Sequence, residues 1–188
     1  QGLMPGSKKL ICVTPHRAMG GAFGQQNGGL WLPIIPGTDT VLHLALARLI
    51  VENGWQDQEF IDKWVAKRWE VDAGYGRGTR NTGWQWRTTW GTWQSDWDDF
   101  KKWILEQEEG KLENAAKMTG LNAEDIRKAA EMIAKPKADG TRPKTSFMLE
   151  KGNYWSNNYM NTASISTLGL ICGAGNRPGR VISRGGGH

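Results

Sequence analysis

A short apolar run, a proline–glycine turn and an amphipathic helix follow one another between residues 30 and 54. This order restricts the fold more than any other feature of the sequence. Residues 30–35 are apolar and are typical of a buried strand, and residues 36–39 form a Pro-Gly-Thr-Asp turn. Apolar side chains then recur every three or four positions, which predicts a helix that Thr38 or Asp39 caps and that ends at a left-handed Gly54. The predicted inner face comprises Val41, Leu42, Ala45, Leu46, Leu49 and Ile50.

Further apolar and amphipathic segments alternate along the chain. They predict strands at residues 9–13 and 145–149 and helices at residues 57–67, 98–108, 112–118, 123–134 and 157–171. We expect Phe60, Ile61 and Trp64 on one inner face, and Asn122 as the cap of the helix that follows it. Residues 20–29 are expected to form a glycine-rich connection, and residues 69–97 a long Gly/Trp-rich loop or insertion. Alternating strands and helices predict an α/β fold with a mostly parallel sheet and flanking helices.

Composition excludes several classes of protein. Eleven tryptophans among 188 residues argue against disorder, and no run of 18 apolar residues predicts a membrane span. The basic residues behind the net charge of +5 are mixed with 19 acids and form no long basic tract, so the charge alone decides little about partners. We do not expect nucleic acid among them. Cys12 and Cys172 each lie in an apolar run, which favours buried thiols over a disulfide or a metal site. Neither a dinucleotide-binding G-x-G-x-x-G motif nor a Walker loop is present.

Three loops lie where ligands bind in α/β folds, at the carboxyl ends of strands or before helices. At each of them the side chains or the backbone could bind a nucleotide. Arginine offers a planar fork of donors, glycine lets a ligand approach the backbone, and a helix N-terminus favours an anion. Each loop also has a simpler interpretation as a turn, a helix cap or a solvated surface. The candidate binding residues are Thr14, Pro15, His16 and Arg17, then Gly37, Thr38 and Asp39, and finally Lys151, Gly152 and Asn153.

The last residues raise a separate hypothesis. Arg184 and His188 are separated by three glycines, which leave space for a bulky group while both side chains approach a small anion. The alternative is a flexible end or a tag remnant. Gln1 is not an initiator methionine and no closing element follows His188, so we expect an internal piece of a longer protein.

Taken in order, these loops and the Asn-Arg-Pro-Gly sequence at residues 176–179 resemble catalytic subunits of the dimethyl sulfoxide reductase superfamily. Residues 150–152, the Asn-rich stretch before Tyr159 and the Arg184–His188 pattern are similar to arsenite oxidase large subunits, and related iodate reductases fit a similar outline. Thr14 stands where the superfamily commonly has aspartate. The resemblance covers nearly the whole chain except residues 69–97.

The resemblance implies a molybdenum oxidoreductase with a bis(molybdopterin guanine dinucleotide) cofactor. Residues 1–68 and 98–188 would be part of its α/β cofactor-binding domain, with no metal ligand among them, and an iron–sulfur cluster would lie nearer the N-terminus. Arg184 and His188 would bind a small oxyanion substrate. Arsenite oxidation is the main expectation, with formate, nitrate, iodate or a sulfur oxyanion as alternative substrates. A Rieske-type iron–sulfur subunit, a downstream electron carrier and a periplasmic location are also implied.

A function of another class also stays open on the residues alone. The tryptophans between Trp84 and Trp97, with scattered arginines, could form a binding module for nucleic acid or carbohydrate. Acidic residues interrupt this region, and aromatic clusters more often cover a core or an interface.

Overall fold

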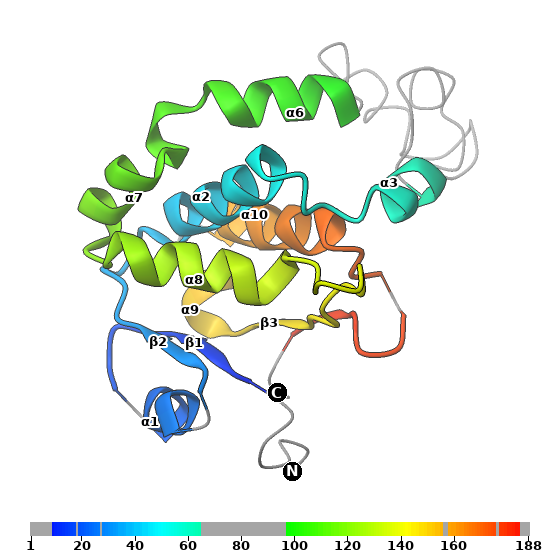
Figure 1. The fold of residues 1–188 in the computed structure, drawn as a ribbon. Coiled ribbons are helices and arrows are strands. Elements are labelled where there is room, and N and C mark those ends of the chain that lie inside the picture. The colour runs from blue at the N-terminus through cyan, green and yellow to red at the C-terminus, as the bar shows by residue number, and fades with distance from the viewer. Residues whose placement is uncertain are drawn as a thin grey trace, which may run out of the picture.

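The computed structural model describes residues 9–17, 19–26, 28–64, 97–155, 158–175 and 177–184. Its strands form two parallel pairs (Figure 1). In one pair β1 (Ile11–Val13) lies beside β2 (Leu30–Leu32), and in the other β3 (Phe147–Leu149) lies beside β4 (Ile182–Arg184). The prediction of a mixed α/β fold is therefore confirmed. The predicted mostly parallel sheet is matched only in part, because among the described residues the parallel strands make two small sheets instead of one.

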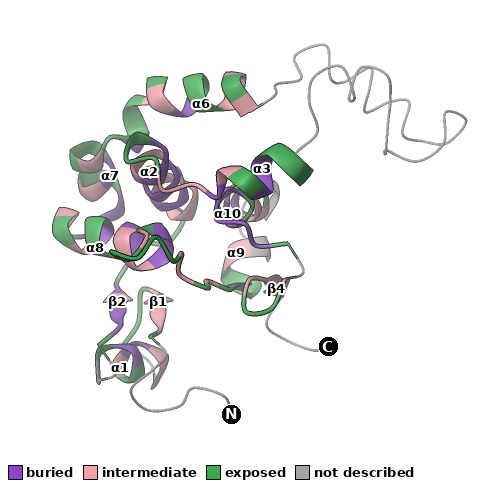
Figure 2. Ribbon diagram, turned by 45° about the vertical axis from the view of Figure 1, so that its right-hand side comes forward, coloured by how far each residue is buried: buried purple, intermediate pink, exposed green. Residues whose placement is uncertain are grey.

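The helix α2 (Asp39–Glu52) is the centre of the fold. It packs against α10 (Asn158–Ile171), α8 (Ala123–Ala134), α7 (Leu112–Thr119) and α6 (Trp97–Glu106). Leu42 and Ile50 have no exposed surface, and Ala45 between them is equally buried. Figure 2 shows that buried residues gather where α2 meets its neighbours, whereas α6 carries mainly exposed and intermediate residues. This helix and its left-handed Gly54 (φ 67°) confirm the sequence prediction. Four members of the predicted inner face are buried, whereas Val41 and Leu49 are half-buried against the core.

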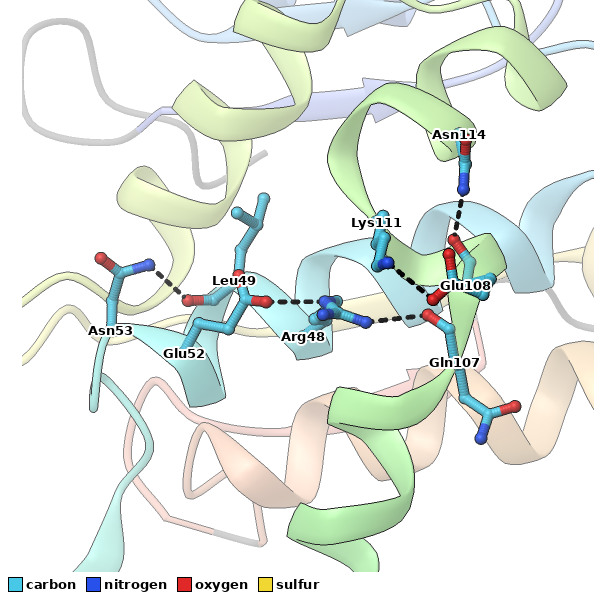
Figure 3. A network of polar contacts seen from close by, with 8 residues as sticks. All are labelled: Arg48, Leu49, Glu52, Asn53, Gln107, Glu108, Lys111 and Asn114. Carbon is cyan, nitrogen blue, oxygen red and sulfur yellow. Dashed lines mark hydrogen bonds and ion pairs between the residues drawn. The ribbon is translucent and has the colours of Figure 1, made fainter.

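A polar network fastens the corner between α6 and α7 onto α2 (Figure 3). The guanidinium of Arg48 donates to Glu52 within α2 and, over 2.8 Å, to the carbonyl oxygen of Gln107. Glu108, which opens a short 3-10 helix (Glu108–Gly110), pairs with Lys111 and accepts a hydrogen bond from Asn114 through its carbonyl oxygen. One nearly buried arginine thus ties together segments far apart in the sequence.

The expected connection at residues 20–29 is wrong in its first part, because α1 (Met19–Gln26) is helical. Glycines weaken a helix, so the sequence indicated a loop. Here they permit close packing instead: a Cβ on Gly21 would lie 2.8 Å from the ring of Trp31 on β2.

Two smaller expectations need correction, and two short elements were not expected. Trp64 ends α3 (Gln58–Trp64) and is 65% exposed, although it was expected on the inner face with Phe60 and Ile61. Trp97 belongs to α6 and not to the expected insertion, while residues 69–96 lie outside the described residues. The sequence also failed to indicate β4 and the short helix α9 (Lys151–Trp155). The cap of α8 is confirmed, since Asn122 Oδ1 accepts from the amide of Glu124.

None of the described helices has both the length and the apolar character needed to cross a bilayer.

Candidate functional site

Two hydrogen bonds show that α2 and α10 run parallel. Thr40 Oγ1 donates to Asn161 Oδ1 over 2.6 Å, and His43 Nδ1 lies 2.9 Å from Ser164 Oγ. A step of three residues along α2 therefore matches a step of three along α10. At the other end, the amide of Asp57 donates to the carbonyl oxygen of Ile171. The N-termini of both helices consequently lie at the same end of the fold.

The tautomer of His43 follows from its partner. Ser164 Oγ donates its single hydrogen to the carbonyl oxygen of Asn161 over 2.9 Å, so its lone pairs remain for His43 Nδ1, which must donate. Burial lowers the pKa of His43 to about 4, because the charged imidazolium would lose its hydration. His43 is therefore neutral near pH 7 and serves as an internal hydrogen-bond donor.

The residues predicted at 37–39 lie at this shared end, immediately before and at the start of α2. Gly37 has a φ of 88°, and a Cβ added there would meet no atom within 4 Å, so the backbone is open to a ligand. Asp39 lies half-buried in the first turn of α2, where the helix dipole favours a carboxylate. Thr38 was one of the two expected caps of α2, but its side chain does not cap the helix. Its hydroxyl donates instead to the carbonyl oxygen of Ile35 over 2.7 Å.

The residues predicted at 151–153 form the start of α9, directly after β3 and shortly before α10. Lys151 is exposed, and its amide donates to the carboxylate of Glu150. A Cβ on Gly152 would meet nothing within 4 Å. Asn153 Oδ1 is buried and has no hydrogen-bond partner in the structure. Because buried acceptors are normally satisfied, this atom is a suitable acceptor for a ligand N–H or O–H group.

The residues predicted at 14–17 follow β1, beside the end of β2. The amide of Thr14 donates to the carbonyl oxygen of Leu32, and the carbonyl oxygen of Thr14 accepts from Trp31 Nε1 over 3.0 Å. Pro15, His16 and Arg17 are exposed, and the guanidinium of Arg17 lies 6.0 Å from the centre of the Trp31 ring. This loop is thus fixed to the β1–β2 pair and offers its imidazole and guanidinium to solvent.

Arg184 is the last residue of β4, where its backbone pairs with Leu149 of β3. The carboxyl ends of these parallel strands therefore place Arg184 and residues 151–153 at the same sheet edge. His188 lies outside the described residues. Within the described ranges, no cluster of three or more histidine, cysteine or acidic side chains could hold a metal ion.

The polar residues that join the two helices could not be recognised from the sequence. Thr40, His43, Asn161 and Ser164 each look ordinary in their own segment. A signal did exist: both helices carry polar residues three positions apart within apolar surroundings. Only the pairing of the helices in space reveals that the two spacings match.

Comparison with known proteins gives two strong similarities. The chain is 78% identical to "Iodate reductase subunit IdrA" of Denitromonas iodatirespirans over 100% of its own length and 21% of that protein. It is 75% identical to the subunit of the same name from Pseudomonas sp. (strain SCT), over 99% of the chain and again 21% of the relative. The chain thus spans about a fifth of the length of the curated relatives it matches.

The "Arsenite oxidase subunit AioA" of Herminiimonas arsenicoxydans is more distant, with 29% identity over 95% of the chain and 18% of that protein. No family model matches the sequence. The three relatives are oxidoreductases, and the chain is much closer to the iodate reductase subunits than to the arsenite oxidase subunit.

Proposed function

We propose, from the membership of this chain in the dimethyl sulfoxide reductase superfamily of molybdopterin oxidoreductases, that it is part of an iodate reductase. The observation that carries the proposal is the identity of 78% along the whole chain to an iodate reductase subunit. The similarity to the arsenite oxidase subunit, at 29% identity, supports the superfamily. It supports arsenite as the substrate less strongly than the 78% identity supports iodate. Iodate reduction therefore replaces arsenite oxidation as the leading hypothesis.

In this proposal the chain holds the nucleotide part of the cofactor at the end where the N-termini of α2 and α10 meet. The residues there suit a guanine dinucleotide. Asp39 can accept hydrogen bonds from the amino group of the base, and Gly37 leaves the backbone accessible. Asn153 offers its unpartnered buried oxygen to a hydroxyl or an N–H group, and Lys151 contributes positive charge near phosphate.

The bound molybdenum cofactor would supply the two-electron redox chemistry. Removal of each oxygen atom from iodate consumes two electrons and two protons and releases one water molecule. The protein must therefore bind an anion and receive electrons from a donor. We assign anion binding to Arg184 and His188, whose side chains carry or can carry positive charge, and electron supply to a Rieske-type partner subunit with its own carrier, in the periplasm.

Activity of the purified full-length protein tests this function. Two assays are run in parallel on one preparation. In the first, a reduced viologen dye supplies electrons for the reduction of iodate; in the second, a different dye in its oxidised form accepts electrons from arsenite. The proposal expects dye oxidation with iodate at a rate at least about tenfold above that of arsenite oxidation. Turnover of arsenite without turnover of iodate would instead restore the arsenite oxidase hypothesis.

Two variants test the assigned anion site in the same assay. Arg184→Ala should raise the KM for iodate and lower kcat/KM by about 10²-fold, as expected for loss of a charged hydrogen bond to the substrate. Arg180→Ala is the matched control, because Arg180 precedes β4 and its guanidinium donates to the carbonyl oxygen of Arg142. Equal effects of the two substitutions would remove Arg184 from the substrate site.

A further inference from the structure

The contact between α2 and α10 contains a polar seam, which we define as Thr40, His43, Asn161 and Ser164. His43 is 5% exposed and Asn161 is 2% exposed, so both polar side chains are removed from water. Their neighbours along the two helices are apolar and equally buried, among them Leu42, Leu46, Ile165 and Leu168. A polar pair inside such a contact needs a structural reason, because apolar packing alone would hold the helices together.

The seam fixes how far one helix can slide along the other. Apolar contacts are not directional, so a helix that shifts along its neighbour can find new apolar partners. The two hydrogen bonds do not permit this, since a shift by one helical turn, about 5.4 Å, would separate Thr40 from Asn161 and the buried imidazole of His43 from Ser164. The partners are three residues apart on both helices, so the two hydrogen bonds can form together only in this register.

The register matters at one end of the helices. Thr40 is one residue after Asp39, and Asn161 lies three residues into α10, which follows α9 and its residues 151–153. The seam therefore joins the first turn of α2, directly after residues 37–39, to the first turn of α10, the helix that α9 contacts. The opposite ends are joined separately, through the amide of Asp57 and the carbonyl oxygen of Ile171.

We infer that Thr40, His43, Asn161 and Ser164 are positioning residues for the cofactor, because their hydrogen bonds hold residues 37–39 and 151–153 in the relative position that binds its nucleotide. This inference rests on the proposed function. Its distinctive consequence is slow release of the bound cofactor, and not the chemistry of the loaded enzyme.

The test compares cofactor release from three variants of the full-length holoprotein. Thr40→Val keeps the shape of the side chain and removes the hydroxyl, whereas Thr40→Ser keeps the hydroxyl. Thr145→Val is the matched control. Thr145 lies two residues before β3, and its Oγ1 donates to the carbonyl oxygen of Ile133 over 2.7 Å, a similar half-buried bond between two segments. Released pterin is followed by its fluorescence after oxidation, and the thermal unfolding midpoint is recorded in parallel.

We expect Thr40→Val to release cofactor about tenfold faster than the wild type, as loss of one hydrogen bond predicts. Thr40→Ser should stay within about twofold of the wild type, and Thr145→Val should lower the unfolding midpoint without faster release. Equal release from Thr40→Val and Thr145→Val at matched midpoints would overturn the inference and leave the proposed function intact. A wild-type protein without pterin would overturn both. Ser164→Ala gives the same comparison if Thr40→Val does not fold.

Discussion

The guanidinium of Arg177 lies 2.9 Å from the carboxylate oxygen Oδ2 of Asp57, 120 positions earlier in the sequence. The same guanidinium donates to the carbonyl oxygen of Gly173 and lies over the ring of Phe60. The other carboxylate oxygen of Asp57 accepts from the amide of Phe60 at the start of α3. The pair thus connects α3, the end of α10 and the turn that leads to β4.

Removal of the positive partner should therefore loosen the approach to β4. Arg177→Met keeps much of the contact with Phe60 but leaves the Asp57 side chain, which is 7% exposed, without its charged partner. We expect a loss of about 2 kcal/mol of stability, because a hydrogen bond to a charged group is lost around a nearly buried carboxylate. Hydrogen exchange of peptides from residues 177–184 measures the effect. Unchanged exchange there would show that the pair does not hold this turn.

The buried His43 makes stability depend on pH. Its pKa is about 4 in the folded protein against an ordinary value of 6.5, so the unfolded chain takes up the proton first as the pH falls. The contribution of the neutral His43 to the free energy of unfolding is fully present above pH 6.5. It is lost as the pH falls towards 4, by at most about 3 kcal/mol. Hydrogen exchange of α2 peptides, corrected for intrinsic rates, should show falling protection in this range. In His43→Asn, whose side chain does not titrate, the protection of α2 should fall less over the same pH range. Identical pH profiles of the variant and the wild type would show that His43 is not the cause of the pH dependence.

Gly169 lets α10 approach the β3–β4 pair closely. A Cβ at this position would lie 2.6 Å from Cδ1 of Ile182 and 3.4 Å from the ring of Phe147. Gly169→Ala should therefore destabilise the protein by about 1–3 kcal/mol through overpacking. Adding Ile182→Ala removes the atoms in conflict, so the double variant should lose less stability than the two single losses added together. Strictly additive unfolding midpoints in denaturant would rule out this contact as the cause.

The two cysteines should differ in reactivity. Burial raises the pKa of Cys172 to about 12, with the nearby Asp57 carboxylate adding to the shift, and burial also raises the pKa of the half-buried Cys12. Because the thiolate is the reactive form, Cys172 should resist alkylation at pH 8 for as long as the protein is folded. Mass spectrometry after timed treatment with iodoacetamide should detect label on Cys12 first. Faster labelling of Cys172 would mean that α10 opens near its C-terminus.

Local patterns predicted the elements whose signals lie within one segment. The apolar repeat of α2, the cap at Asn122 and the strand before residue 150 all follow from neighbouring residues, and all are confirmed. The helix α1 and the strand β4 were missed because their form depends on partners far along the chain. The glycines of α1 fit against Trp31, and β4 is stabilised by pairing with β3.

The same distinction applies to the candidate site. The turn at residues 37–39 could be located from sequence because a strand, a glycine and a helix start are consecutive there. The unpartnered oxygen of Asn153 and the bond between His43 and Ser164 could not. The first depends on the surroundings of α9, which contacts β3 and α10, and the second depends on how α2 packs against α10. The substrate could not be derived from residue chemistry either. Arginine and histidine suit arsenite, iodate and other oxyanions alike, and only the similarity to iodate reductase subunits favours one of them.

A cryo-electron microscopy map of the full-length holoprotein tests the central claim most directly. The account predicts density for a guanine nucleotide against residues 37–39 and 151–153, with the base within hydrogen-bond distance of Asp39 and a nucleotide group near Asn153 Oδ1. Nucleotide density at the opposite end of the helices, beside Asp57 and Ile171, would contradict it.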